Sequence, residues 1–349
     1  MKNQVRSIPE MTDNMTAQAD TPEPKASWKK QLLVWGKLLI FILVIVWVVH
    51  EIWKTSGEIA AYKWSLHWGW ILLSCGIYFT AYLPAWIYWH LCMKTLGQKP
   101  HWFRSLRAYY IGHLGKYVPG KAVVVTLRTG LMHSEKTKIS ILVAAVFLET
   151  LTMMAVGVMV SCLLLTMFFH EVLVSLFHQQ PILALAAAVM LIGFILTVIP
   201  HNFKRILLIL GVGKKSPEVR EKLNRLGTKT LVTGWFLMAV TWLILGVSLW
   251  TTIKGLGIDP GPFFGQLPRF IAAMSLSTVG GFLSLIPGGF GVRELILAGV
   301  MGNYFHTLTL PQGLTPEAAG LVLAGITRLI SIFTELAVST VLYPLGKWK

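Results

Sequence analysis

Six long apolar runs are the feature of this sequence that most restricts its fold. They cover residues 32–53, 68–91, 139–168, 182–199, 231–253 and 318–345. A helix needs about 20 predominantly apolar residues to cross the hydrocarbon core of a membrane, and each run approaches or exceeds that length. Charged residues make up only 13% of the 349 residues, about half the usual ~25% of soluble domains. The pattern excludes an ordinary soluble enzyme, a disordered protein and a secreted disulfide scaffold. It predicts an all-α polytopic membrane protein.

Two further stretches, residues 101–135 and 268–303, are moderately apolar and are each interrupted near the centre by a Pro-Gly pair. Arms of roughly 16–19 residues on either side of such a turn are short for complete spans. Non-helical backbone at this depth is tolerated only where it is buried in protein or lines a wet cavity. We therefore predict two re-entrant broken hairpins in addition to about six full transmembrane helices. Short spanning hairpins are the alternative.

The distribution of Lys and Arg predicts the topology. Residues 94–107 and 201–230 are rich in Lys and Arg, whereas 170–180 and 304–316 contain neither. Because cytoplasmic loops carry the excess of basic residues, we expect the first two segments and both termini on the cytoplasmic side of the inner (cytoplasmic) cell membrane. The net charge of +16 is then explained by loops beside anionic lipid, and no nucleic-acid partner is needed.

The domain organisation follows from the order of these segments. Residues 1–27 are polar and contain three prolines, which predicts a disordered cytoplasmic tail, and residues 28–349 form a single transmembrane domain. The order span, span, broken hairpin, span occurs in 32–168 and again in 182–345, with the basic cytoplasmic linker 201–230 inside the second unit. Three crossings in each unit make the second unit inverted relative to the first. Inverted repeats with broken helices are typical of secondary transporters.

Several ionisable residues lie inside the apolar segments, where they are costly and usually functional. The acids are Glu149, Glu294 and Glu335, and the cations are Lys116, Lys121, Arg128, Arg293 and Arg328. Arg328 and Glu335 are seven positions apart and therefore share a helix face. Two hypotheses follow: a buried Arg–Glu pair that locks helices together, or a polar cavity that receives a charged lipid headgroup.

The second Pro-Gly turn contains Gly288, Gly289 and Gly291, which predicts backbone with positive φ. Helix starts at such breaks present free N–H groups and the positive end of the helix dipole, and Arg293 follows within one turn. We interpret the two turns and the intramembrane charges as one headgroup cavity. Its predicted residues are Lys116, Pro119, Gly120, Lys121, Arg128, Glu149, Pro287, Gly288, Gly289, Gly291, Arg293, Glu294, Arg328 and Glu335.

The sequence offers no signature of catalysis. We find no Ser-centred nucleophile elbow, no His-Glu-x-x-His and no cysteine pair with metal-ligand spacing. Gly115, Gly120 and Lys121 match the beginning of a P-loop, but Ala122 stands where the motif needs Ser or Thr for Mg²⁺. We therefore expect no catalytic residue, no metal, no cofactor and no ATP-driven step, and we predict that the protein is not an enzyme.

The stretches Gly115-Lys-Tyr-Val-Pro-Gly-Lys121, followed by Arg128, and Ile286-Pro-Gly-Gly-Phe-Gly-Val-Arg-Glu294 resemble the two marker stretches of the lysylphosphatidylglycerol synthase transmembrane (flippase-like) family. The resemblance covers roughly residues 30–345. It implies a membrane domain that moves aminoacylated phospholipids across the bilayer. The sequence stops four residues after the last predicted span, so we expect no aminoacyl-transferase domain. Family members often pair Arg with an acid in the span after the first motif, whereas that span here offers Glu149 without Arg.

Together these observations predict an integral membrane protein that translocates or binds lipid headgroups. The expected partners are membrane lipids, anionic or aminoacylated, and a separate lipid-modifying enzyme. Two other functions stay open: a non-transporting scaffold or regulator of a lipid pathway, and a small-solute transporter. The sequence gives no prediction of the oligomeric state.

Overall fold

Helices form the whole of the regular structure in the part of the chain that the computed structural model describes. The described residues are 64–118, 122–133, 137–168, 227–284 and 286–346, with isolated residues at 50, 53, 57, 59, 62, 192, 202, 205 and 221. The α-helices are α2 (Trp68–Thr95), α3 (Trp102–His113), α4 (Ala122–Met132), α5 (Ile139–Phe168), α10 (Thr228–Gly255), α11 (Phe263–Leu283), α12 (Val292–Phe305) and α13 (Pro316–Leu342). Short 3-10 turns are η1 (Leu114–Tyr117), η2 (Pro287–Gly289) and η3 (Pro344–Gly346).

Four of the six predicted apolar runs are confirmed as long helices. They are α2, α5, α10 and α13, and each is long and apolar enough to cross a membrane. The runs at 32–53 and 182–199, the predicted tail at 1–27 and most of the basic linker at 201–230 lie outside the described residues.

Helices α2 and α10 pack against each other in antiparallel orientation. The Ser74 hydroxyl donates to the Ser248 carbonyl at 2.8 Å, and the His67 N–H donates to the Gly255 carbonyl at 2.9 Å. At the other end of the pair, Gly234 leaves room for the ring of Tyr88. The start of α2 therefore lies beside the end of α10.

Helices α3 and α4 form a hairpin whose two ends lie together. Arg104, near the start of α3, donates to the Leu131 carbonyl at 3.0 Å and to the His133 carbonyl at 2.7 Å, at the end of α4. Arg107 donates to the Leu342 carbonyl at 3.0 Å, at the end of α13. The 12 residues of α3 span only about 18 Å, less than the ~30 Å hydrocarbon core. Helix α3 alone is therefore too short to cross the hydrocarbon core.

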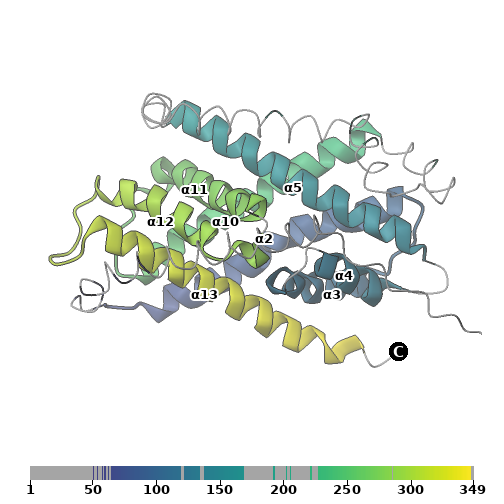
Figure 1. Ribbon diagram of the computed structural model, residues 1–349, viewed down its shortest axis with the longest axis horizontal. Coiled ribbons are helices and arrows are strands. Elements are labelled where there is room, and N and C mark those ends of the chain that lie inside the picture. Colours follow the sequence, from purple (N-terminus) through teal and green to yellow (C-terminus); the bar gives the residue numbers. More distant parts are fainter. Residues whose placement is uncertain are drawn as a thin grey trace, which may run out of the picture. The chain divides into compact units, whose positions relative to one another are not determined.

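Helices α11 and α12 form a second hairpin that opens at the opposite end of the bundle. The Tyr304 hydroxyl, near the end of α12, donates to the Pro260 carbonyl just before α11 at 2.7 Å. The tips of the two hairpins touch, since a Cβ placed on Gly288 would lie 3.6 Å from the Lys116 carbonyl oxygen. Figure 1 shows α3 and α4 toward one end of the described helices and α11 and α12 toward the other. The described parts of the two turns therefore lie next to each other.

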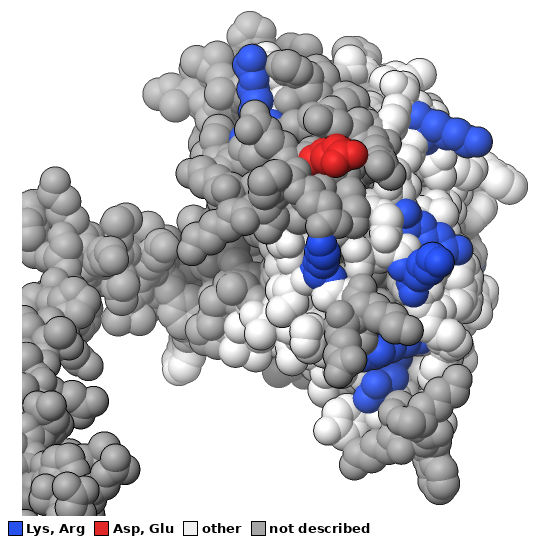
Figure 2. Space-filling model, turned by 90° about the vertical axis from the view of Figure 1, so that its right-hand side faces the viewer, with Lys and Arg blue, Asp and Glu red and all other residues white. Residues whose placement is uncertain are grey.

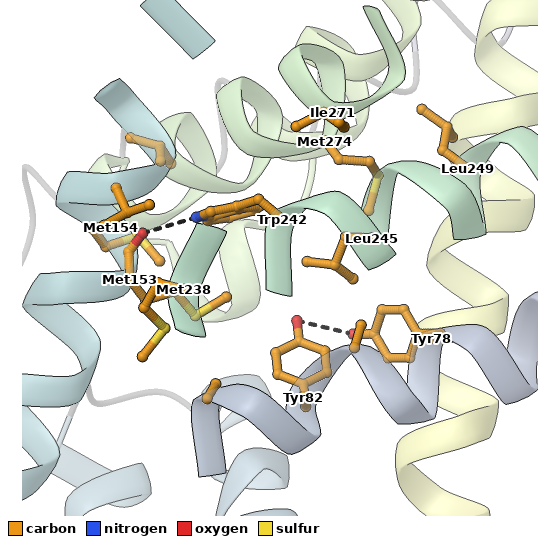
Figure 3. Packing of buried hydrophobic residues seen from close by; sticks show 14 of the residues in the cluster. Tyr78, Tyr82, Met153, Met154, Met238, Trp242, Leu245, Leu249, Ile271 and Met274 are labelled. Atoms are coloured by element: carbon orange, nitrogen blue, oxygen red, sulfur yellow. Dashed lines mark hydrogen bonds between the residues drawn. The ribbon is translucent and has the colours of Figure 1, made fainter. Parts of the chain in front are cut away.

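The packed core joins α2, α5, α10 and α11. Trp242 of α10 is fully buried, and its indole N–H donates to the Met153 carbonyl of α5 at 3.1 Å, as Figure 3 shows. Gly157 on α5 lies against the same indole ring, where a side chain would collide with it. The glycine leaves the space that the indole ring occupies, so α5 and α10 can pack closely.

The end of the bundle that carries the starts of α3 and α5 and the end of α13 is basic. Figure 2 shows Lys and Arg side chains spread over this face, with little acidic surface among the residues drawn in colour. Segment 94–107 lies at this end, whereas segment 304–316 follows α12 and lies at the other. The basic segment 94–107 and the segment 304–316, which has no Lys or Arg, therefore lie at opposite ends of the described helices.

Candidate functional site

A cavity of about 290 Å³ lies where the tips of the two hairpins meet α5. One wall comes from η1, α4 and α5, and the other from α11, η2 and α12. Most of the lining is apolar, and includes Val124, Val146, Phe147, Met154 and Ile286. The ionisable side chains that line it are Tyr82, His113, Lys116, Arg128, Glu149 and Arg293. The cavity thus combines a charged region with an apolar one.

Arg128 and Glu149 form a buried ion pair between α4 and α5. The guanidinium Nη1 lies 2.7 Å from Glu149 Oε2, and both side chains are almost fully buried. The Tyr109 hydroxyl donates to Glu149 Oε1 at 2.8 Å, and the Arg128 guanidinium stacks 4.0 Å from the centre of the Tyr109 ring. The arginine that the span of Glu149 lacks is therefore supplied by the preceding hairpin arm.

Lys116 and Glu335 form a second ion pair, between η1 and α13. Glu335 Oε1 accepts from the Lys116 ammonium and, at 2.7 Å, from the Tyr78 hydroxyl of α2. Lys116 lines the cavity, whereas Glu335 lies behind it and is 4% exposed. This pair joins the tip of the first hairpin to the last helix.

Arg328 pairs with Glu294 and not with Glu335, which corrects one of the two hypotheses for the shared helix face. Its Nη1 lies 3.4 Å from Glu294 Oε1 and donates to the Gly288 carbonyl at 2.9 Å. Seven positions on a helix share a face but are separated by about 10 Å along the axis. Arg328 therefore reaches the second hairpin while Glu335 reaches the first.

Arg293 differs from the other buried cations of the site. It lines the cavity and is 6% exposed, yet its side chain has no hydrogen bond or ion pair with any described residue. Burial of a charged group without a partner is costly. Among the described residues, Arg293 is therefore the cation of the cavity that has no carboxylate within ion-pair distance.

The glycine turn has the predicted backbone conformation, with φ of 60° at Gly288, 65° at Gly289 and 83° at Gly291. Its N–H groups are not free as expected. Gly289 donates to the Ile286 carbonyl, Phe290 donates to the Pro287 carbonyl, and Gly291 donates to Glu294 Oε2 at 2.7 Å. Glu294 thus supplies the negative charge at the start of α12. Because these three amides are already hydrogen-bonded, the turn offers fewer free N–H groups to an anion than expected.

The sequence matches the profile of one protein family, described as Lysylphosphatidylglycerol synthase TM region, over residues 34–339. The chain belongs to this family. It is accordingly a membrane protein of a lipid-related family. No curated protein matches the sequence.

All the residues that line the cavity lie within the part of the chain that matches the family. Of the predicted site residues, those that line the cavity are Lys116, Arg128, Glu149, Pro287, Gly288, Gly289 and Arg293. Gly291, Glu294, Arg328 and Glu335 are outside that lining. Pro119, Gly120 and Lys121 lie outside the described residues.

Three tyrosines at the site were missed by the sequence reasoning. Tyr109 hydrogen-bonds Glu149, Tyr78 hydrogen-bonds Glu335, and Tyr82 contacts Tyr78 and the ring of His113. Their positions in apolar helices made them resemble core or interfacial aromatics. The four-residue spacing of Tyr78 and Tyr82, which places both hydroxyls on one helix face, was the available signal.

Proposed function

We propose that this protein binds phospholipid headgroups in the cavity between its two hairpins and passes them across the membrane without ATP. The cavity supports this proposal because cationic side chains lie beside apolar walls, as an amphiphile requires. Membership of a lipid-related membrane family supports it as well. In this proposal the protein moves lipids without changing them chemically.

The observation that carries the proposal is Arg293. Around the cavity there are four buried or half-buried cations, Lys116, Arg128, Arg293 and Arg328, and three carboxylates that pair with all but Arg293. A phosphodiester would supply the missing negative charge. The planar guanidinium can bind two phosphate oxygens at once. We therefore infer an anionic headgroup held first by Arg293.

We also propose that the chain consists of two inverted repeats that enter the membrane from opposite faces, with the basic end cytoplasmic. Each described half contains a long helix, a broken hairpin and a second long helix. The second long helix of each half packs against the hairpin of the other half, α5 against α11 and α13 against α3. Such an arrangement, with a site where the breaks meet, suits alternating access.

Reconstitution into liposomes tests this function. Vesicles carry fluorescent phosphatidylglycerol or phosphatidylcholine in the inner leaflet, and a membrane-impermeant quencher reports its arrival outside. We expect wild-type protein to move phosphatidylglycerol faster. We expect Arg293→Gln to reduce the rate at least about tenfold, which corresponds to ~1.4 kcal/mol of lost interaction, and Arg293→Lys to restore only part of it.

Lys94→Gln is the matched control, because it removes an exposed cation on α2 outside the cavity. Its rate should equal that of the wild type. Folded Arg293→Gln protein that transports at the wild-type rate would refute the cavity as the headgroup site. Wild-type vesicles that move no lipid would refute transport and leave the scaffold function as the better explanation.

A further inference from the structure

Glu335 lies between two cavities. On one side is the Lys116 ammonium, which lines the large cavity. On the other side is a pocket of about 10 Å³, lined by Tyr78, Phe79, Tyr82, Tyr110, His113, Thr334, Glu335 and Val338. That volume is close to the minimum needed by one water molecule. Tyr82 and His113 line both spaces, so the small pocket lies next to the large cavity.

The carboxylate of Glu335 has one oxygen in use and one free. Oε1 accepts from Lys116 and from the Tyr78 hydroxyl, while the buried Oε2 has no hydrogen-bond partner among the described residues. The Tyr78 hydroxyl donates to Glu335 Oε1 at 2.7 Å and has a longer contact, 3.4 Å, with the Tyr82 hydroxyl. A buried carboxylate oxygen without a hydrogen-bond partner can accept a proton.

We propose that Glu335 takes up one proton when an anionic headgroup binds in the cavity, so that lipid binding is coupled to protons. The inference rests on the proposed function. The proton comes from solvent, adds to the carboxylate, and returns to solvent when the lipid leaves. No other bond is made or broken.

The physical reason is competition for Lys116. A phosphate beside Arg293 brings a second anion next to an ammonium that already pairs with Glu335. Two anions that share one cation in a desolvated site repel each other, and a proton on Glu335 removes that repulsion. Because such coupling is reciprocal, protonation of Glu335 also frees Lys116 for the headgroup.

The other ionisable groups near Glu335 do not replace it as the acceptor. They are Tyr78 and Tyr82 on α2, Tyr110 and His113 on α3, Lys116 and Tyr117 on η1, Arg293 and Glu294 on α12, and Arg328 on α13. α10 has titratable residues only near its ends, at Lys229 and Lys254, and η3 has none.

Two of these groups are committed elsewhere. Glu294 pairs with Arg328 and accepts from the Gly291 amide, so it does not compete with the headgroup for Lys116. His113 Nδ1 faces Arg128 Nη2 at 3.3 Å, so that nitrogen acts as an acceptor of a guanidinium N–H. This leaves Glu335, which shares the ammonium of Lys116 with an incoming anion, as the acceptor of the added proton.

The test is calorimetry on the purified full chain with dioctanoyl phosphatidylglycerol as the probe. Titrations near neutral pH in two buffers of different ionisation enthalpy give the number of protons taken up per lipid bound. The phosphodiester itself stays ionised in this range. We expect about one proton to be taken up per lipid bound. The affinity for the lipid should then fall about tenfold for each unit by which the pH rises, over the range where uptake occurs.

Variants assign the proton to its acceptor. Glu335→Gln should bind the lipid without proton uptake. This change leaves Lys116 buried without a counter-charge. The double variant Lys116→Met with Glu335→Gln has no unpaired charge at this position, and it too should show no proton uptake. Glu317→Gln is the matched control on the same helix, since Glu317 is 59% exposed and remote from the cavity. It should take up protons as the wild type does.

The outcomes separate this inference from the function on which it rests. Lipid binding by the wild type without proton uptake, or uptake that survives in Glu335→Gln, would overturn the coupling and leave the headgroup site intact. Absence of lipid binding by the wild type would refute the proposed function, and the coupling with it.

Discussion

Removal of one partner of the Arg128–Glu149 pair should destabilise the fold by about 3–5 kcal/mol, the usual cost of an uncompensated buried charge. Arg128 and Glu149 are each 2% exposed, and their charged atoms are 2.7 Å apart. Glu149→Gln keeps the size of the side chain but leaves the guanidinium without a counter-charge. The stacking of Arg128 on Tyr109 at 4.0 Å is retained, so the loss reports on the carboxylate.

Thermal stability in detergent, read by the fraction of protein that stays monodisperse after heating, measures this effect. At about 2 °C per kcal/mol, the lower end for large domains, Glu149→Gln and Arg128→Gln should each lower the midpoint by at least about 6 °C. The double variant leaves no unpaired charge, so its loss should be clearly smaller than the sum of the two single losses. Glu317→Gln breaks an exposed pair with His306 and should cost less than about 1 kcal/mol.

Two results would refute this reasoning. If each single variant lost less than the exposed control, the pair would not be buried in the folded protein. If the double variant lost as much as both single variants together, the two charges would not interact.

Two further predictions follow from the hairpin geometry. Gly289→Ala should lower the thermal midpoint, because φ at Gly289 is 65° and the added Cβ would lie 2.7 Å from Gly281 Cα. The control Gly299→Ala meets open space on α12 and should raise or preserve the midpoint. Equal midpoints for the two variants would mean that the hairpin tip is not packed as described. Single cysteines at the exposed positions His101 and Gln312 should differ in their reaction with an impermeant maleimide. Gln312→Cys should be labelled in intact cells, and His101→Cys only after the cells are opened; labelling of both in intact cells would contradict the topology.

Much of the helical framework could be predicted from the sequence, because the length of an apolar run is a local property that the bilayer thickness alone constrains. Helix α5 has the predicted bounds, and α2, α10 and α13 differ from theirs by a few residues at their ends. The positive φ values at Gly288, Gly289 and Gly291 were also accessible, since a Pro-Gly-Gly turn leaves few backbone alternatives.

The pairing of the intramembrane charges was decided by the tertiary structure. Helical spacing placed Arg328 and Glu335 on one face. It could not show that Arg328 would contact the tip of the second hairpin, 40 positions away, or that Glu335 would contact the tip of the first hairpin, 219 positions away. Nor could it show that Glu294 would accept a hydrogen bond from the Gly291 amide of its own turn. These contacts depend on how far each side chain reaches across the packed helices.

The sequence by itself thus determined that this chain forms apolar helices of membrane-spanning length, with two broken hairpins that carry charge, because periodicity, length and glycine content act locally. The tertiary structure decided that the two tips meet, that a cavity lies between them and that Arg293 is the cation left without a carboxylate. Charge balance at a buried site is a sum over groups from distant segments, and only their three-dimensional arrangement fixes which of them cancel.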